Sequence, residues 1–311
     1  MLNYGNGVEI LKKMLTKVKK TFEGGLYVTA TPIGNLGDIT LRGVDLLKAA
    51  DLIACEDKRV SGKLLSYFDI KTPMISYHDH NADSVMPRLM DELNAGKIVA
   101  LISDAGTPLI SDPGYKLVNN CQKEGVMVTS LPGASALLCA LTISGMPTDN
   151  FLFCGFLPSK TTARCKELEK FLKVPATLVY YESPKRLLAS LKDMKSMLGN
   201  RLVAVCRELT KLYEEVRKDQ LDELIEYYEG RPNPKGEIVI IVEPPAKDQS
   251  VIDDLYDALL AALKKLTVKE MGVKIQIIDV MKEMALSGVL NEEPIGSFGL
   301  TKKTSTLISV I

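Results

Sequence analysis

An α/β fold with two domains is the class that this sequence predicts, and three observations support it. The chain has 311 residues, enough for about two domains of ordinary size. From residue 26 to about residue 245, short apolar segments typical of strands alternate with amphipathic segments typical of helices. The run from Ile98 to Ile102 is apolar throughout, as expected for a strand buried on both faces of a sheet. This alternation predicts largely parallel sheets covered by helices.

Changes in composition divide the chain into four parts. A basic N-terminal extension, two α/β domains and a helical or irregular C-terminal tail follow one another. The turn-rich segment 146–150 is expected to separate the two domains, and a pair of prolines ends the second one. The predicted boundaries are residues 1–25, 26–147, 148–246 and 247–311.

The two end segments have the weakest pattern. Five lysines crowd residues 12–20, and we interpret this part as a solvated extension. Two alternatives stay open, an upstream start with Met14 as the true initiator and a basic arm that contacts RNA phosphates. In the tail, residues 251–265 are predicted to form one helix.

Capping residues and glycines mark the elements of the first domain. Thr40 and Ser84 are predicted to cap the N-termini of two helices, and Gly96 and Gly125 to follow the C-termini of two helices. The predicted strands cover 26–31, 52–55, 98–102 and 126–131, and the other helices cover 115–124 and 134–144.

The second domain repeats the alternation. Ser183 followed by Pro184 predicts an N-cap with proline at the first helical position. The apolar stripe of that helix is expected at Leu187, Leu188, Leu191 and Met194. The predicted strands cover 151–156, 176–181, 202–206 and 238–242, and a further helix covers 161–172.

Composition excludes several classes of protein. Lys plus Arg and Asp plus Glu number 39 each, so a uniformly basic surface for nucleic acid is excluded, whereas a local basic face is not. Continuous apolar runs reach only five or six residues, and a membrane span needs about 20. The six cysteines contain no C-x-x-C pair, so we expect them to be reduced and buried, which fits a cytoplasmic protein. With only two histidines, no metal site is predicted.

Three glycine-containing turns follow predicted strands of the first domain. The most informative is the loop 103–114, in which Gly106 allows a ligand to approach the backbone, and Asp104 and Asp112 offer carboxylates for hydroxyls or a cation. The turns 31–38 and 131–136 are each more often structural when taken alone. Because the carboxyl ends of parallel strands meet at one sheet edge, the three turns together predict a small-ligand site there.

Charged segments follow other strands. Glu56 and Asp57 end a predicted strand and could lie at the mouth of the site, or they could be the solvated start of a helix. The cluster 78–81 contains both histidines and is interpreted as a polar or RNA-contacting loop rather than as a metal site. Basic residues in 180–186 and 207–211 could meet phosphates, or they could be ordinary strand–helix junctions.

These segments together resemble the tetrapyrrole methylase superfamily of S-adenosylmethionine (SAM) methyltransferases, in its branch that methylates ribosomal RNA. The resemblance keeps its order from about residue 26 to residue 243. The loop Asp104 to Gly114 together with the turn Thr31 to Leu36 is its most specific part. The other matching segments are Asp38 to Thr40, Glu56–Asp57, His78 to Asn81, Gly155 to Pro158, Tyr181 to Pro184, Arg207 to Lys211 and Lys235 to Glu237.

The resemblance implies two α/β domains with SAM in the cleft between them, and a homodimer. It also implies transfer of a methyl group to the ribose 2′-hydroxyl of a decoding-centre cytidine in 16S rRNA. Two forms of the substrate stay open, the assembled 30S ribosomal subunit and bare rRNA. The residues expected to line the SAM site by this resemblance are Asp104, Ala105, Gly106, Thr107, Pro108, Ile110, Ser135 and Ala136.

The mechanism expected from these residues is simple. The SAM methyl group is already activated, so the protein has to align the ribose hydroxyl and relieve it of its proton. Glu56 and Asp57 are the candidate catalytic carboxylates. The candidate phosphate contacts are Arg42, Arg59, Lys63, Arg186 and Lys211.

Two alternative functions remain open. One is a tetrapyrrole methylase that acts on carbon of a precorrin or uroporphyrinogen, for which basic residues over the cleft would be expected. The other is a module that binds SAM or RNA without turnover, motivated by Lys58, Ala82 and Lys185, where members of the family usually have other residues.

Overall fold

Two five-stranded sheets with helices packed on them make up the computed structural model, which describes residues 22–246. The described residues of both sheets belong to one compact unit that extends to Pro245. The predicted division at residue 147, the extension up to residue 21 and the tail helix are not tested, since the last two lie outside the described residues. The two sheets confirm the predicted α/β class.

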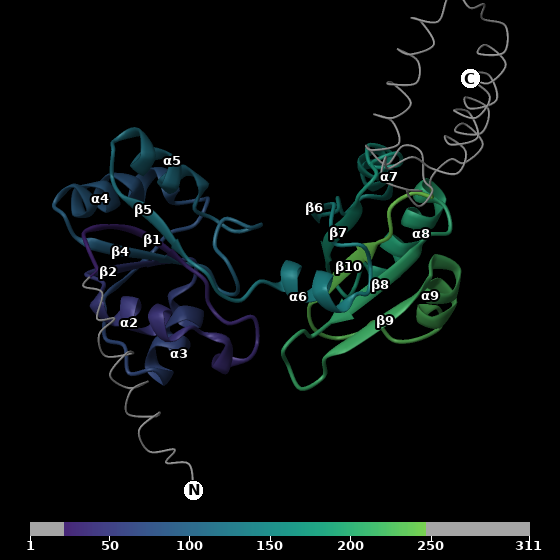
Figure 1. Ribbon diagram of the computed structural model, residues 1–311, viewed down its shortest axis with the longest axis horizontal. Helices are drawn as coiled ribbons and strands as arrows, with labels where there is room; N and C mark the ends of the chain where they lie inside the picture. The colour runs from purple at the N-terminus through teal and green to yellow at the C-terminus, as the bar shows by residue number, and fades with distance from the viewer. Residues whose placement is uncertain (1–21, 247–311) are drawn as a thin grey trace, which may run out of the picture. The chain divides into compact units, whose positions relative to one another are not determined.

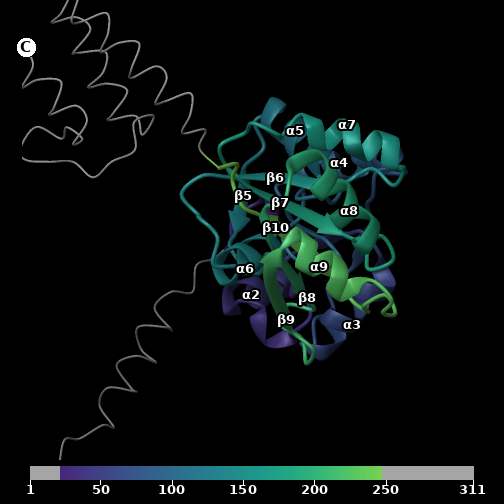
Figure 2. The same cartoon turned by 90° about the vertical axis from the view of Figure 1, so that its right-hand side faces the viewer.

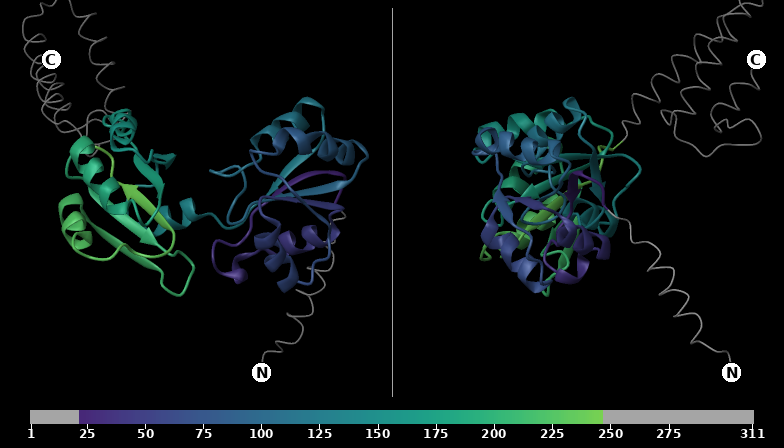
Figure 3. Two further views of the ribbon diagram at one scale, coloured as in Figure 1. Left: turned by 180° about the vertical axis from the view of Figure 1, so that it is seen from behind. Right: turned by 90° about the vertical axis from the view of Figure 1, so that its left-hand side faces the viewer.

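The first sheet has the order β3-β2-β4-β1-β5, and all of its strands are parallel. Figure 1 shows α2 and α3 on one face of this sheet and α4 and α5 on the other, and Figure 3 shows the same arrangement from behind. The strands are β1 (Gly25–Thr29), β2 (Leu52–Cys55), β3 (Met74–Ser76), β4 (Ile98–Ile102) and β5 (Val128–Leu131). The helices are the short 3₁₀ helix η1 (Leu36–Asp38), α2 (Leu41–Ala49), α3 (Lys58–Tyr67), α4 (Ala82–Asn94) and α5 (Tyr115–Lys123).

Alternation along the strands divides the core of this sheet into two layers. Leu26 and Val28 face a cluster that includes Leu89 of α4, whereas Tyr27 faces a cluster that includes Leu46 of α2. Successive side chains of a strand point to opposite faces, so a strand between two helix layers must be apolar throughout. Strands β2 and β4 are uniformly apolar for this reason, and both lie at the residues predicted from the sequence.

The second sheet has the order β6-β7-β10-β8-β9 and is mixed. Only β6 and β7 are parallel, whereas β10 runs antiparallel to both β7 and β8, and β9 is antiparallel to β8. The strands are β6 (Phe151–Phe156), β7 (Thr177–Glu182), β8 (Leu202–Arg207), β9 (Glu215–Gln220) and β10 (Ile238–Val242). The helices are α6 (Ala136–Ile143), which precedes the sheet, and α7 (Thr161–Glu169), α8 (Leu187–Leu198) and α9 (Leu221–Tyr228).

The expectation of largely parallel strands is therefore wrong for the second sheet. The segment 208–214 joins β8 to β9 without a helix, and a connection this short permits only antiparallel pairing. The core on one face contains Leu168, Leu191 and Leu224 from α7, α8 and α9. Figure 2 shows α8 and α9 lying over this face, and the other face packs against α6.

Two predicted helix caps are wrong. Helix α4 begins at Ala82, two residues before Ser84. Its N-cap residue is Asn81, whose side chain binds the backbone of Ser76 and His78 instead of the helix. Helix α8 begins after Arg186 rather than at Ser183. Thr40 is the N-cap of α2 as predicted, because its hydroxyl accepts a hydrogen bond from Gly43 N at 3.0 Å.

Five elements were not predicted as such: η1, α3, β3, β9 and α9. Strand β9 carries mainly charged residues at the edge of its sheet, where one face stays in water, and it therefore lacks an apolar alternation. The six cysteines form no disulfide, and three are buried and three half-buried. Among the described residues, no helix has the length and apolar composition needed to cross a membrane.

Candidate functional site

A cavity of about 370 Å³ lies where loops of the first sheet meet strands of the second. Its volume falls in the range of small-molecule sites, roughly 300–1,000 Å³. Six of the eight residues expected at the SAM site line it: Ala105, Gly106, Thr107, Ile110, Ser135 and Ala136.

The three glycine-containing turns converge at this cavity, as the sequence predicts. Thr31 and Gly106 exchange two backbone hydrogen bonds of 2.9 and 3.0 Å, which join the first turn to the loop 103–114. The Thr107 hydroxyl donates to the carbonyl of Ala134 at 3.1 Å and so joins the third turn. Gly106 has φ of +79°, in the left-handed region that glycine adopts without strain.

Asp104 and Pro108 are the two predicted residues that do not line the cavity. Pro108 is buried. The Asp104 carboxylate instead accepts a hydrogen bond from the backbone N–H of Asp57 at 3.1 Å, which connects the loop 103–114 to the start of α3.

The prediction omitted the share of the cavity that the second sheet contributes. Tyr181 and Glu182 at the end of β7 line it together with Glu237 and Ile238 at the start of β10. Ile238 pairs with Glu182 because β10 is antiparallel to β7, so the amino end of β10 reaches the same edge as the carboxyl end of β7. Both segments, 181–184 and 235–237, belong to the family resemblance found in the sequence. The antiparallel pairing that brings them together could not be predicted from the sequence. Ile33, Ser111, Asp112, Phe156, Ser183, Pro184, Gly236 and Val239 complete the lining.

Three carboxylates and no basic side chain line the cavity among the described residues. Two of the carboxylates are already paired. Glu182 forms an ion pair with Arg186 at 2.7 Å and accepts from the Ser190 hydroxyl at 2.5 Å, and Glu237 lies 3.1 Å from Lys211. The third, Asp112, has no ion pair within residues 22–246.

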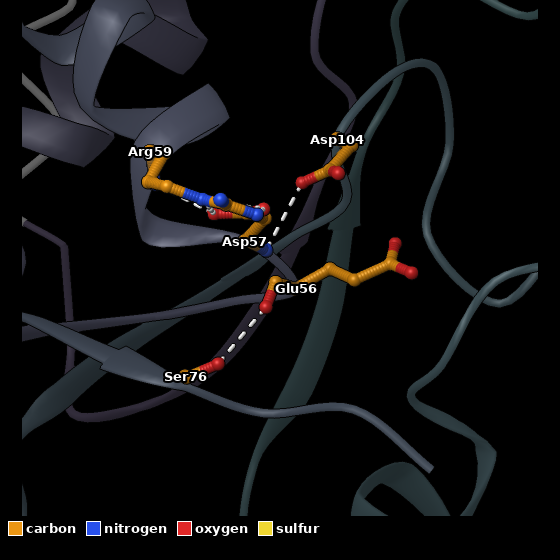
Figure 4. A network of polar contacts seen from close by, with 5 residues as sticks. All are labelled: Glu56, Asp57, Arg59, Ser76 and Asp104. Carbon is orange, nitrogen blue, oxygen red and sulfur yellow. Dashed lines mark hydrogen bonds and ion pairs between the residues drawn. The ribbon is translucent and has the colours of Figure 1, made fainter. Parts of the chain in front are cut away.

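The candidate catalytic carboxylates lie in the network drawn in Figure 4. The backbone of Glu56 and Asp57 is held on both sides, because the Ser76 hydroxyl donates to the carbonyl of Glu56 at 2.9 Å and Asp57 N donates to Asp104. The Glu56 side chain extends away from these contacts. Neither Glu56 nor Asp57 lines the cavity itself.

The structure gives the two carboxylates different chemistry. The Asp57 side chain caps α3 by accepting from Arg59 N at 2.8 Å and also pairs with the Arg59 guanidinium at 2.6 Å, and these bonds lower its pKa to about 2. The pKa of Glu56 is raised, mainly by burial and further by the negative charges of Asp104 and other nearby carboxylates. A carboxylate with a raised pKa and a free side chain is the better proton acceptor, so the arrangement favours Glu56.

The five candidate phosphate contacts differ in how free their charges are. Arg59 is paired with Asp57, Arg186 with Glu182, and Lys211 with both Glu208 and Glu237. The other two candidates, Arg42 and Lys63, are exposed and have no ion pair within the described part of the chain.

Lys211 also holds two distant segments together. Its aliphatic stem crosses Gly34 so closely that a Cβ atom there would lie 2.4 Å from the Lys211 Cγ. Gly34 has φ of +153° and no side chain, which leaves room for the stem. The turn 31–38 is thereby packed against the turn that follows β8. The described residues contain no group of three or more His, Cys, Asp or Glu arranged to hold a metal ion.

Comparison with known proteins supplies the family. The model of the family described as Tetrapyrrole (Corrin/Porphyrin) Methylases matches residues 25–225. A protein of Mesorhizobium japonicum named ribosomal RNA small subunit methyltransferase I is 50% identical over 248 residues, which cover 78% of this chain and 84% of the relative. The chain belongs to the tetrapyrrole methylases, in the ribosomal RNA small subunit methyltransferase I group.

Further relatives agree across distant bacteria. The ribosomal RNA small subunit methyltransferase I of Vibrio cholerae is 45% identical, covering 84% of this chain and 92% of its own length. The fold is also found in solved structures, since a diphthine synthase superposes with a TM-score of 0.55 at 13% identity, covering 70% of this chain and 89% of its own. At that identity the likeness concerns the fold alone. The tetrapyrrole methylase fold predicted from the sequence is confirmed.

Proposed function

We propose that this chain transfers the methyl group of SAM to the ribose 2′-hydroxyl of a decoding-centre cytidine in 16S rRNA. The observation that carries the proposal is the cavity, six of whose lining residues are those expected for SAM, in a chain whose relatives are named for methylation of small-subunit rRNA. The proposed substrate is 16S rRNA, either bare or within the 30S subunit.

The residues of the cavity fit SAM. Ile33, Ile110 and Val239 supply apolar surface for a nucleoside. Ser135 and Ala136 stand at the N-terminus of α6, where free backbone N–H groups favour a carboxylate such as that of the methionine portion. Gly106 packs closely against another residue of the cavity wall, since a Cβ at Gly106 would stand 3.3 Å from the Ile33 side chain.

In the proposed mechanism, SAM supplies a methyl group on a sulfonium that leaves as a neutral sulfide. The loop 103–114 would fix the position of the donor, with Gly106 allowing close contact. Glu56 would accept the proton of the ribose hydroxyl as the new O–C bond forms, and its raised pKa suits that task. Ser76 and Asp104 hold the backbone on either side of Glu56 and would keep its carboxylate in place.

The alternative tetrapyrrole substrate would require basic side chains over the cleft, because a uroporphyrinogen or precorrin carries several carboxylates. The relatives of this chain are instead named for methylation of small-subunit rRNA, which favours the ribosomal RNA substrate.

A homodimer is part of the proposal. Helix α6 is almost wholly apolar, and its Leu138 and Ile143 are 51% and 46% exposed in the single chain. Apolar side chains gathered on one helix favour a protein–protein contact. Light scattering at micromolar concentration should give twice the chain mass, and a Leu138→Glu variant should give the mass of one chain.

The experiment that tests the function is transfer of a tritiated methyl group from SAM to 30S subunits that lack their endogenous modification. The labelled product is digested and the nucleoside identified. We expect label in 2′-O-methylcytidine. Label in another nucleoside would overturn the assigned target. Absence of label with intact SAM binding would favour the module without turnover.

A further inference from the structure

Asp112 is the one acidic side chain of the cavity whose charge no cation balances within the described residues. It lies in the loop 103–114 and is half-buried. The residue before it, Ser111, has φ of +63°, an uncommon conformation for a residue other than glycine. Leu109 of the same loop also has positive φ, at +73°, and backbone of this kind persists where the surrounding structure fixes it.

Burial makes this lone carboxylate costly. Burial is the main cause that raises the pKa of Asp112; hydrogen bonding by Ser103 opposes the rise and the charge of Asp104 adds to it. A half-buried carboxylate is stabilised most by a cation brought in from outside when, as here, residues 22–246 supply none. Glu182 and Glu237, by contrast, have Arg186 and Lys211 as partners.

We propose that Asp112 is the counter-charge for the methylsulfonium of the cofactor, so that the cavity binds the charged methyl donor more tightly than its neutral-sulfur product. The inference rests on the proposed function, since it requires SAM in this cavity. It assigns to Asp112 a role in selecting the charge state of the cofactor, separate from the proton transfer assigned to Glu56.

Because the sulfur loses its charge in the reaction, a preference for SAM over S-adenosylhomocysteine would favour release of the product. The S–CH₃ bond breaks and its electron pair stays on sulfur, the O–CH₃ bond forms, and the hydroxyl proton passes to Glu56. The sulfur thereby loses its positive charge while Asp112 keeps its negative charge. The attraction between them ends at that step, and the product S-adenosylhomocysteine is released more readily than SAM.

Three ligands that differ in this one charge test the proposal. SAM carries the sulfonium, S-adenosylhomocysteine has a neutral sulfur, and sinefungin has an ammonium group in place of the methylsulfonium. Their Kd values are measured by calorimetry with the full chain as wild type, Asp112→Asn and Glu237→Gln. Glu237→Gln is the matched control, because it removes the same charge from a cavity carboxylate that Lys211 already balances.

We expect Asp112→Asn to weaken SAM and sinefungin by about tenfold and S-adenosylhomocysteine by less than about twofold, as for one charge pair at close range in a partly screened site. Glu237→Gln should change all three affinities by the same factor. Equal weakening of all three ligands by Asp112→Asn would overturn the proposal, because Asp112 would then face a group that they share. Unchanged affinities would overturn it too.

A second measurement does not depend on the variant folding. In the wild-type chain, raising the salt concentration should weaken SAM and sinefungin more than S-adenosylhomocysteine. Salt screens the charges that the three ligands share in the same way, and it also screens the one positive charge that only SAM and sinefungin carry at this position. Parallel salt dependence for the three ligands would contradict the inference. If none of the three binds the wild-type chain, the proposed function fails and this inference with it.

Discussion

Asp104 and Asp57 are joined by a hydrogen bond of 3.1 Å, from the backbone N–H of Asp57 to the carboxylate of Asp104. The bond connects the loop that follows β4 to the residue that caps α3. On the opposite side, Ser76 at the end of β3 holds the carbonyl of Glu56. Glu56 is thus carried by a peptide segment fixed from two neighbouring strands, next to the cavity-lining loop.

Replacing Glu56 should abolish most of the methyl transfer. Loss of a positioned proton acceptor typically costs 10²–10⁴-fold in rate, so we expect Glu56→Gln to lower kcat by at least about 100-fold. The Kd for SAM should stay within about twofold, because Glu56 does not line the cavity. Asp57→Asn is the control and should keep most of the activity, since asparagine caps helices as well as aspartate does. A larger loss in Asp57→Asn than in Glu56→Gln would refute the assignment.

The pH dependence of the reaction should report the raised pKa of Glu56. Only the ionised carboxylate accepts a proton, so kcat/KM should rise with pH through that pKa and then level off. Asp104→Asn removes a negative charge that raises this pKa and keeps an oxygen for Asp57 N, so the rise should move to lower pH. The exposed Asp69→Asn should leave the profile in place. A profile that does not move in Asp104→Asn would argue against Glu56 as the titrating group.

Substitution of Gly236 should destabilise the chain for two reasons, its positive φ and a clash of the added Cβ with Glu208. A Cβ at Gly236, where φ is +95°, would lie 2.2 Å from the Glu208 carboxylate. Gly199→Ala is a matched control, because its φ is +82° and nothing lies within 4 Å of the added atom. We expect the free energy of unfolding, from urea titration, to fall by about 1 kcal/mol in Gly199→Ala and by roughly 2–3 kcal/mol in Gly236→Ala. Equal losses would show that Glu208 moves aside freely.

The buried guanidinium of Arg164 should matter for stability. Arg164 is 2% exposed and lies 2.5 Å from the Asp193 carboxylate, with further bonds to the carbonyls of Pro158 and Ser159. Removing one partner of a buried ion pair costs about 3–5 kcal/mol, and we expect Arg164→Ala to lower the free energy of unfolding by an amount in this range. Lys192→Ala breaks the exposed pair with Glu229 and should cost less than about 1 kcal/mol. Comparable losses in both variants would contradict this account.

The candidate phosphate-binding residues should separate into two groups in rRNA binding. Removing a basic side chain that meets one phosphate reduces the slope of log K against log salt by about one, so Arg42→Ala and Lys63→Ala should each flatten it by about that amount. Arg59 and Lys211 are neutralised by carboxylates within the chain, so their alanine variants should change the slope less. A flatter slope in Lys211→Ala than in Arg42→Ala would mean that RNA displaces Glu208 and Glu237 from the lysine.

The sequence by itself determined most of the strands and helices and one half of the site. Local periodicity was sufficient for β2, β4 and β10, because a strand buried between layers must be apolar along its whole length. The convergence of the turns at Thr31, Gly106 and Ala134 followed from parallel strands ending at one edge. The order of the motifs along the chain was sufficient to identify the family.

Only the tertiary structure decided the other half of the site, which the second sheet contributes. Strand β10 inserts antiparallel between β7 and β8 and so delivers Glu237 to the cavity. Its pairing with β7 joins residues more than 50 positions apart, and no local pattern contains that pairing. The tertiary structure also decided the pKa values of the carboxylates. Asp57 and Glu56 are neighbours in the chain, yet Arg59 lowers the pKa of one while burial among carboxylates raises the pKa of the other. A side chain's chemistry depends on what folding brings near it, and that is a property of the packed structure rather than of the residue type.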